Sequence, residues 1–215
     1  MFNIQRQLEI LLEANQKINA TLEIPIIMQA LVSSSITLVD ATAGTAGLFA
    51  DNKIVFTEYN DRGNLRDINY EFKKGDGVAG WIIETKEPYF TNQAFEDSHV
   101  IPEIQQKLGI YNVISVPILS KSGELLGCVE IHNSNDNREF DEVDVELLAG
   151  LSSSGATALE NAQIKDDLLK KEEELNEKIK DLENFYDLSV NRELKIKELN
   201  EEIASLKEKL SQAGQ

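Results

Sequence analysis

The sequence contains few of the side chains that form disulfides and zinc sites, with one cysteine and two histidines among 215 residues. Because Cys128 is the only thiol, an intramolecular disulfide, a cysteine-rich zinc site and a two-cysteine redox cycle are excluded within one chain. No apolar run approaches the roughly 20 residues that a membrane span needs, and the first residues lack the basic and apolar segments of a secretory signal. We therefore expect a cytoplasmic protein with no membrane partner.

Basic residues are also scarce, because 21 Lys and Arg face 38 Asp and Glu and give a formal charge of −17. A field of that sign repels phosphate groups, so the composition predicts no nucleic-acid partner. The Gly-x-Ser-x-Gly, Walker and His-Glu-x-x-His motifs of common catalytic sites are absent as well. We therefore expect a protein that is not an enzyme.

The C-terminal part of the chain differs sharply in composition from the rest. Residues 160–215 contain no proline, no tryptophan and only one glycine, Gly214, which is typical of a long solvated helix. Apolar residues recur there at spacings of three and four, which predicts two coiled-coil seams. These seams are Leu175, Ile179, Leu182 and Tyr186, then Ile196, Leu199, Ile203, Leu206 and Leu210.

The two seams are out of register with each other. Ile179 and Ile196 are 17 residues apart, two heptads and three residues, and such a stammer overwinds a supercoil locally. The slip falls in or near residues 185–194. Two interpretations stand side by side: a strained stretch with two packings of similar energy, and a local irregularity without function.

The predicted tail helix needs a partner. With Asp141 as its N-cap, it runs to about Ser211 and spans roughly 70 residues. No isolated helix of that length buries its own seam, and residues 4–22 carry a shorter heptad pattern of their own. A homodimer through the terminal helices, most simply a parallel one, is the expected assembly.

Between these helices the sequence predicts a domain with both helices and strands. A helix is expected from Pro25 to about Asp40, a short one after the glycine-rich turn at 75–81, and a mixed loop and helix at 92–111. A tight turn at Asp51-Asn52 joins the first two of six expected strands. These strands are residues 45–50, 53–60, 68–72, 88–91, 112–120 and 125–132.

Several short segments, in their order and spacing, carry a family resemblance. They are Gly75-Asp76-Gly77-Val78-Ala79-Gly80-Trp81, Glu84-Thr85-Lys86-Glu87-Pro88, Ser115-Val116-Pro117-Ile118, Gly123-Glu124-Leu125-Leu126-Gly127-Cys128-Val129-Glu130-Ile131 and Phe140-Asp141-Glu142-Val143-Asp144. Together they resemble a GAF domain, the small-molecule-sensing module of bacterial signalling proteins and cyclic-nucleotide phosphodiesterases. The resemblance covers roughly residues 22–162. It leaves 1–21 as an N-terminal dimerisation helix and 163–215 as a coiled-coil signalling helix.

The resemblance implies an α+β fold in which a central antiparallel sheet carries the terminal helices on one face and a ligand pocket on the other. In cyclic-nucleotide-binding relatives, the positions that match Val78, Ala79 and Glu130 face the purine or the phosphate. Phe95 and Tyr111, near the expected pocket, are candidates to stack on a planar ligand, although lone aromatic residues more often belong to a core. These five residues form the expected ligand site.

One motif departs from the pattern of the family. Relatives that bind cyclic nucleotides carry an Asn-Lys, Phe, Asp-Glu signature, of which Asn133, Phe140 and Asp144 are present here. Ser134 replaces the lysine and Val145 replaces the glutamate, so the lysine–aspartate pair of that corner cannot form. The departure counts against a cyclic nucleotide as the ligand.

Three other ligand or reaction classes of the family are disfavoured by residue type. A bilin needs a suitably placed cysteine, and Cys128 is expected to be a small core residue. Haem needs a histidine ligand, and His99 and His132 are expected at the surface or in turns. Methionine-sulfoxide reduction needs more than one thiol. The ligand, and any cofactor, therefore stays unknown at this point.

These observations predict a sensory module, in which a homodimeric GAF domain binds a small molecule and passes its state through the coiled coil. The alternative is a ligand-free scaffold or dimerisation protein that recruits a partner kinase, cyclase or regulator. The downstream signalling protein is expected either on a separate chain or beyond these residues. Residues 188–194 also look like the helical linkers that follow GAF and PAS sensors and precede an output module.

Overall fold

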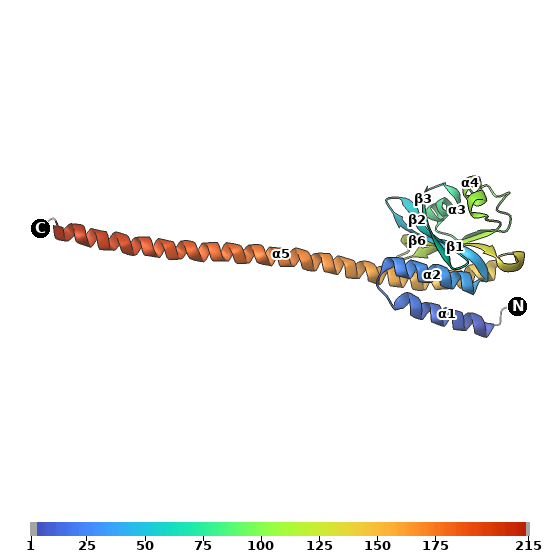
Figure 1. The fold of residues 1–215 in the computed structure, drawn as a ribbon, viewed down its shortest axis with the longest axis horizontal. Coiled ribbons are helices and arrows are strands. Elements are labelled where there is room, and N and C mark those ends of the chain that lie inside the picture. Colours follow the sequence, from blue (N-terminus) through green and yellow to red (C-terminus); the bar gives the residue numbers. More distant parts are fainter. Residues whose placement is uncertain (1–3, 214–215) are drawn as a thin grey trace. The chain divides into compact units, whose positions relative to one another are not determined.

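The computed structural model describes residues 4–213, without the side chains of residues 4, 137, 187–190, 193, 206 and 208–213. The chain divides into two units, Met1–Ile164 and Lys165–Gln215. The helices in Figure 1 are α1 (Ile4–Asn19), α2 (Ile24–Leu38), α3 (Gly77–Thr85), α4 (Pro102–Leu108) and α5 (Glu142–Ala213), with a 3-10 turn at Asn135–Asn137. The strands are β1 (Ala41–Ala50), β2 (Lys53–Asp61), β3 (Asn64–Lys73), β4 (Tyr89–Thr91), β5 (Val113–Leu119) and β6 (Leu125–Ser134).

The strands form one antiparallel sheet in the order β3-β2-β1-β6-β5-β4. The predicted α+β fold with a long C-terminal helix is confirmed. Asp51 and Asn52 both have positive φ, at 51° and 61°, as the predicted two-residue hairpin turn requires. β3 begins at Asn64, earlier than predicted, because a second tight turn at Arg62 and Gly63 returns the chain directly from β2.

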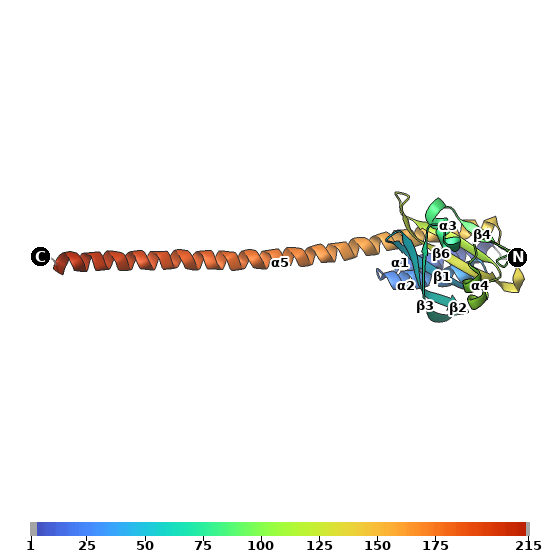
Figure 2. The same cartoon turned by 90° about the horizontal axis from the view of Figure 1, so that it is seen from above.

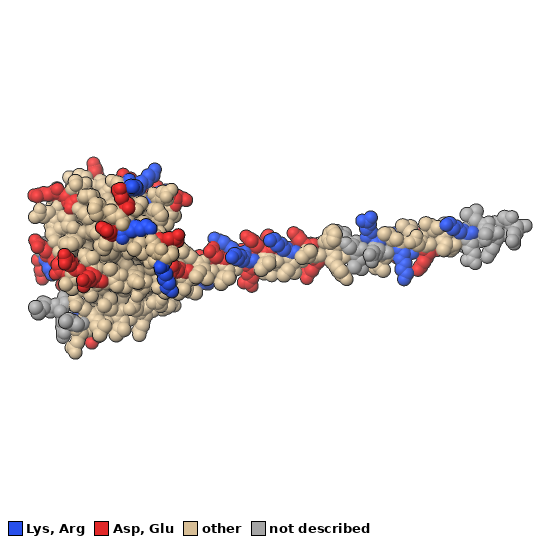
Figure 3. All heavy atoms as spheres, turned by 180° about the vertical axis from the view of Figure 1, so that it is seen from behind, with Lys and Arg blue, Asp and Glu red and all other residues tan. Residues whose placement is uncertain are grey.

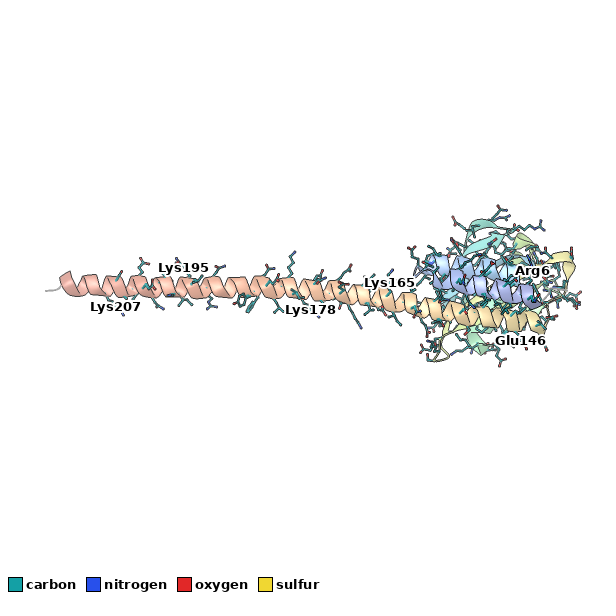
Figure 4. The ribbon with its side chains drawn as sticks, turned by 90° about the horizontal axis from the view of Figure 1, so that it is seen from below. Arg6, Glu146, Lys165, Lys178, Lys195 and Lys207 are labelled. Carbon is teal, nitrogen blue, oxygen red and sulfur yellow. The ribbon has the colours of Figure 1, made fainter. Side chains whose placement is uncertain are left out.

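One face of the sheet is covered by α2 and the first part of α5, and α1 packs against α2 on the side away from the sheet, as Figure 1 shows; Figure 2 gives the view from above. Gly155 of α5 packs against Leu31 of α2, and a Cβ on that glycine would lie 2.9 Å from a Leu31 methyl group. Figure 4 looks onto this helical layer, from which Arg6 and Glu146 project outward. The buried residues of this main core include Ile27, Leu31, Ile114, Val129, Ile131, Leu148 and Leu159.

The opposite face of the sheet is covered by α3, α4 and the loop between β4 and α4. Phe56, Ile82 and Cys128 belong to a second core there. Cys128 is fully buried, as expected, and burial raises the pKa of its thiol. At Gly80, a Cβ would lie 2.6 Å from the carbonyl oxygen of Lys73, so the glycine permits the close contact between α3 and the end of β3.

From Lys165 onward, α5 exposes the apolar residues of the predicted seams in the single chain. Lysine and acidic side chains, among them Lys178 and Lys195, project along the same stretch (Figures 3 and 4). No stretch of the described helices combines the length and the hydropathy of a membrane span. The side chains of Leu206, Leu210 and residues 187–190 lie outside the described residues. The described seam residues are Leu175, Ile179, Leu182, Tyr186, Ile196, Leu199 and Ile203.

Candidate functional site

A small cavity of about 40 Å³ lies beneath α3 and α4, and is called the α3–α4 cavity below. Glu130 and His132 of β6 form its floor, and Val78 and Ala79 at the start of α3 form one wall. The loop before α4 and α4 itself cover it. Because a buried water needs about 10–15 Å³, this volume is roughly that of three waters.

The first turn of α3, whose residues line this cavity, carries backbone donors without acceptors. Asp76 precedes the helix but makes no capping bond, and its carboxylate instead accepts the backbone N–H of Lys73 at 3.1 Å. Within the described residues, the N–H groups of Gly77, Val78 and Ala79 therefore have no acceptor. Because these donors coincide with the positive end of the helix dipole, the turn suits a carbonyl or anionic oxygen of a ligand.

The floor of the cavity holds a buried histidine between two polar groups. His132 is 2% exposed, its Nδ1 lies 3.2 Å from the Tyr59 hydroxyl, and its Nε2 lies 3.6 Å from Glu130 Oε2 without a hydrogen-bond partner. Burial raises the pKa of Tyr59, so its hydroxyl stays protonated, and it shares a hydrogen bond with His132 Nδ1.

The expected surface or turn position is wrong for His132. Glu130 and His132 are two residues apart on β6, so both side chains lie on the same face of the sheet, the one that α3 and α4 cover. The turn begins only after Ser134, where the strand ends. His99 is closer to the expectation, because it lies in the loop before α4 and its side chain is partly exposed.

An aromatic cluster fixes the cover of the α3–α4 cavity. The His99 ring packs against those of Trp81 and Tyr89, with centroids 5.3 and 5.0 Å away. The Tyr89 hydroxyl donates to Asp97 Oδ2 at 2.7 Å, and the His99 N–H donates to Asp97 Oδ1 at 2.8 Å. Burial opposes ionisation of Asp97, but these hydrogen bonds outweigh it and lower its pKa. Burial, and then the bond to Asp97, raises the pKa of Tyr89.

The five residues of the expected ligand site do not all come together. Val78, Ala79 and Glu130 line the α3–α4 cavity. Phe95 is 74% exposed and lies outside the lining. Tyr111 also lies outside it, and its hydroxyl donates to a backbone carbonyl at the end of β6. The Tyr59–His132 contact and the aromatic cluster were not predicted from the sequence, because neither belongs to a contiguous motif.

The corner where the family signature departs is closed by a different ion pair. Arg138 donates to both carboxylate oxygens of Asp144, at 2.7 and 3.0 Å, and the hydrogen bond to Asp144 raises the pKa of Arg138. The lysine–aspartate pair is absent, as expected, and an arginine four positions after Ser134 supplies a cation to Asp144 in its place.

A family model described as "GAF domain" matches residues 21–160 of the chain. Among curated proteins, the cGMP-specific 3',5'-cyclic phosphodiesterase of Drosophila virilis is 32% identical over 93 residues, which cover 42% of this chain and 10% of that protein. The Drosophila melanogaster protein of the same name is 31% identical over 93 residues, with 42% and 8% covered. The chain thus spans a small part of these relatives.

Solved structures show the same fold at low sequence identity. The GAF domain of a phosphoenolpyruvate-protein phosphotransferase from Coxiella burnetii matches with a TM-score of 0.63 and 21% identity, over 77% of this chain and 99% of that one. Free methionine-R-sulfoxide reductase from Neisseria meningitidis, in complex with its substrate, matches with a TM-score of 0.63 and 14% identity, over 74% and 91%. Identities this low carry the fold and not the activity.

Proposed function

The chain belongs to the GAF domain family, whose model covers residues 21–160, and on that premise we propose that it is a sensory module. GAF domains are small-molecule-sensing signalling modules, and this one is proposed to bind its ligand in the α3–α4 cavity. The bound state passes through a homodimer of α1 and α5 to a downstream signalling protein. Its role is regulatory rather than catalytic, and we place it in the cytoplasm.

The observation that carries the proposal is a set of polar groups without partners around one cavity. His132 Nε2 is buried and unbonded, Glu130 lies 3.6 Å from it, and the first residues of α3, whose N–H groups have no acceptor, line the same cavity. A buried polar group without a hydrogen bond costs about 1–3 kcal/mol. A ligand that offers a donor to Glu130, a hydrogen-bond partner to His132 and an acceptor to α3 recovers part of that cost.

The small volume of the cavity makes opening part of the proposal. About 40 Å³ is too little for a metabolite, so the loop before α4 must move when one binds. Tyr89, Asp97 and His99 hold that loop in place. A ligand that binds only the open form shifts the population toward it, in proportion to its differential affinity for the two forms.

The transmitting element in this proposal is a dimer of the terminal helices. Leu8 and Leu12 of α1 and the seam of α5 are exposed in the single chain. Burial of apolar surface is worth roughly 25 cal/mol per Å², and a parallel coiled coil buries the whole seam. Because α5 begins in the GAF unit and runs into the tail, a shift of its first turns reaches the seam.

A second candidate function is a scaffold whose cavity never opens. The same small volume favours it, because Ile101 and Ile104 already fill the space beneath α4. In that case the dimeric coiled coil recruits its partner without a ligand. The two candidates differ in one measurable property, which is whether the cover responds to any small molecule.

Trp81 offers a direct test, because it is the only tryptophan and its ring contacts the cover through His99. Cyclic nucleotides and fractions of a metabolite extract are titrated while Trp81 emission is recorded. The sensory module predicts a saturable change that Glu130→Gln weakens and that Glu124→Gln, in the exposed β5–β6 turn, leaves intact. An unchanged emission across all fractions favours the scaffold.

A further inference from the structure

A second and larger cavity lies on the other face of the sheet, between α2 and the strands β1 and β2. Its volume is about 280 Å³, several times that of the α3–α4 cavity, and we name it the helix-face cavity. Ala46, Leu48 and Met28 pack against the main core on this face. The apolar walls include Met28, Val32, Ala46, Leu48, Val55 and Leu65.

One carboxylate stands at the edge of these apolar walls. Glu58 accepts two hydrogen bonds from Gln29 Nε2, at 3.0 and 2.8 Å, and lines the cavity. Asp67 of β3 is its register partner, and like charges in such a pair repel each other. Among the described residues, neither carboxylate has a cation within ion-pair distance.

We propose that the helix-face cavity is a ligand site for a small amphipathic cation, an amine carried on an apolar body of one or two rings. The ammonium group pairs with Glu58 and relieves its repulsion with Asp67. The apolar body fills the space between Met28 and Leu48. The volume lies just below the usual range for small-molecule sites, about 300–1,000 Å³, and the formal charge of −17 attracts cations.

Such a ligand would act on the helical layer directly. It contacts Met28 and Val32 of α2, and Leu31, which lies between these two residues in the sequence of the same helix, packs against Gly155 of α5. Binding therefore stiffens or shifts the helix that abuts α5, without passing through the α3–α4 cavity. The site is independent of the proposed sensory function, because it lies on the opposite face of the sheet.

Isothermal titration calorimetry with 2-phenylethylamine tests the charge requirement. The full chain is expected to bind the amine, with 2-phenylethanol and 3-phenylpropanoate binding at least about tenfold more weakly. Glu58→Gln keeps the shape of the side chain and an acceptor for Gln29. It is expected to weaken binding of the amine at least about tenfold. The matched control Glu124→Gln, an exposed carboxylate elsewhere, leaves binding unchanged.

Cavity-filling variants locate the ligand. Ala46→Phe at the wall, or Thr57→Phe at the exposed rim if the first variant does not fold, is expected to abolish amine binding. Ala79→Trp in the α3–α4 cavity is expected to leave it intact, which separates this site from the sensory one.

Four results would overturn the proposal. They are no binding of the amine up to about 10 mM, equal binding of the alcohol, loss of binding in Ala79→Trp alone, and dissociation of a dimer by the filling variants in sedimentation. The last result would mean that a second copy of the chain covers the cavity.

Discussion

The Cβ position of Gly80 in α3 lies 2.6 Å from the carbonyl oxygen of Lys73 at the end of β3, and 2.9 Å from the backbone of Gly75. The nearest atoms are backbone atoms of two residues, and they cannot move aside as the end of a flexible side chain can. This contact sets how closely α3 approaches the sheet, and therefore how far its first turn lies from Glu130 and His132, which line the same cavity.

Gly80→Ala is therefore expected to destabilise the domain by about 1–3 kcal/mol through overpacking. Gly150→Ala is the matched control, because it is also a helical glycine but has no atom within 4 Å of its Cβ position. Alanine is favoured over glycine in a helix by about 1 kcal/mol, so Gly150→Ala should stabilise. Urea unfolding of both variants measures the contrast, and equal effects would contradict this packing argument.

Arg138 links the start of α5 to the end of α2. Besides its two bonds to Asp144, which is 5% exposed, it donates to the carbonyl oxygen of Val39 at 2.7 Å. Arg138→Ala leaves a buried carboxylate without its cation and should cost about 2 kcal/mol of unfolding free energy. Arg138→Lys should recover only part of it, since an ammonium lacks the two-pronged geometry. A loss below about 0.5 kcal/mol, the range of ordinary surface substitutions, would mean that the pair is not structural.

Cys128 is expected to be unreactive in the folded chain. Its side chain is fully buried, and burial raises the pKa of the thiol, so the thiolate that attacks alkylating agents is scarce. Iodoacetamide at pH 7 and at pH 9 should label it only after unfolding in urea, as followed by mass spectrometry. Fast labelling without urea would show that the second core opens readily.

The lowered pKa of Asp97 predicts that the cover of the α3–α4 cavity is sensitive to acid. Hydrogen bonds lower its pKa in the folded chain, so the stability it adds is present above its unfolded pKa, about 4, and is lost as the pH falls through the lower folded value. Asp97→Asn should therefore cost on the order of 1 kcal/mol at pH 7, and less at pH 3. Thermal melts at both pH values measure this, with Glu96→Gln in the same loop as the control. A cost that is constant with pH would contradict the assignment.

The architecture was readable from the sequence because it depends on local signals. The turn at Asp51-Asn52, the N-cap at Asp141 and the glycine-rich start of α3 each specify a local backbone conformation, and the structure has all three. Cys128 was correctly placed in a core, because a small apolar residue within an apolar strand is usually buried.

The site was less readable because it depends on strand order and packing. Tyr59 and His132 meet although β1 lies between their strands, with the small Ala43 opposite His132. Arg138 reaches Asp144 because a 3-10 turn follows β6, and Asp136 in it adopts a φ of 55°. Cavity volume and the exposure of Phe95 depend on side-chain packing, which no spacing of residues encodes.

Native mass spectrometry of the protein purified gently from its host tests the sensory function most directly, with Ala79→Trp measured alongside. A filled cavity predicts a dimer that carries one extra small-molecule mass per chain, and a dimer of Ala79→Trp that carries none. Denaturing extraction of the first sample then identifies the ligand. A bare dimer in both samples, still bare after incubation with cyclic nucleotides and a metabolite extract, would contradict the sensory function and favour the scaffold.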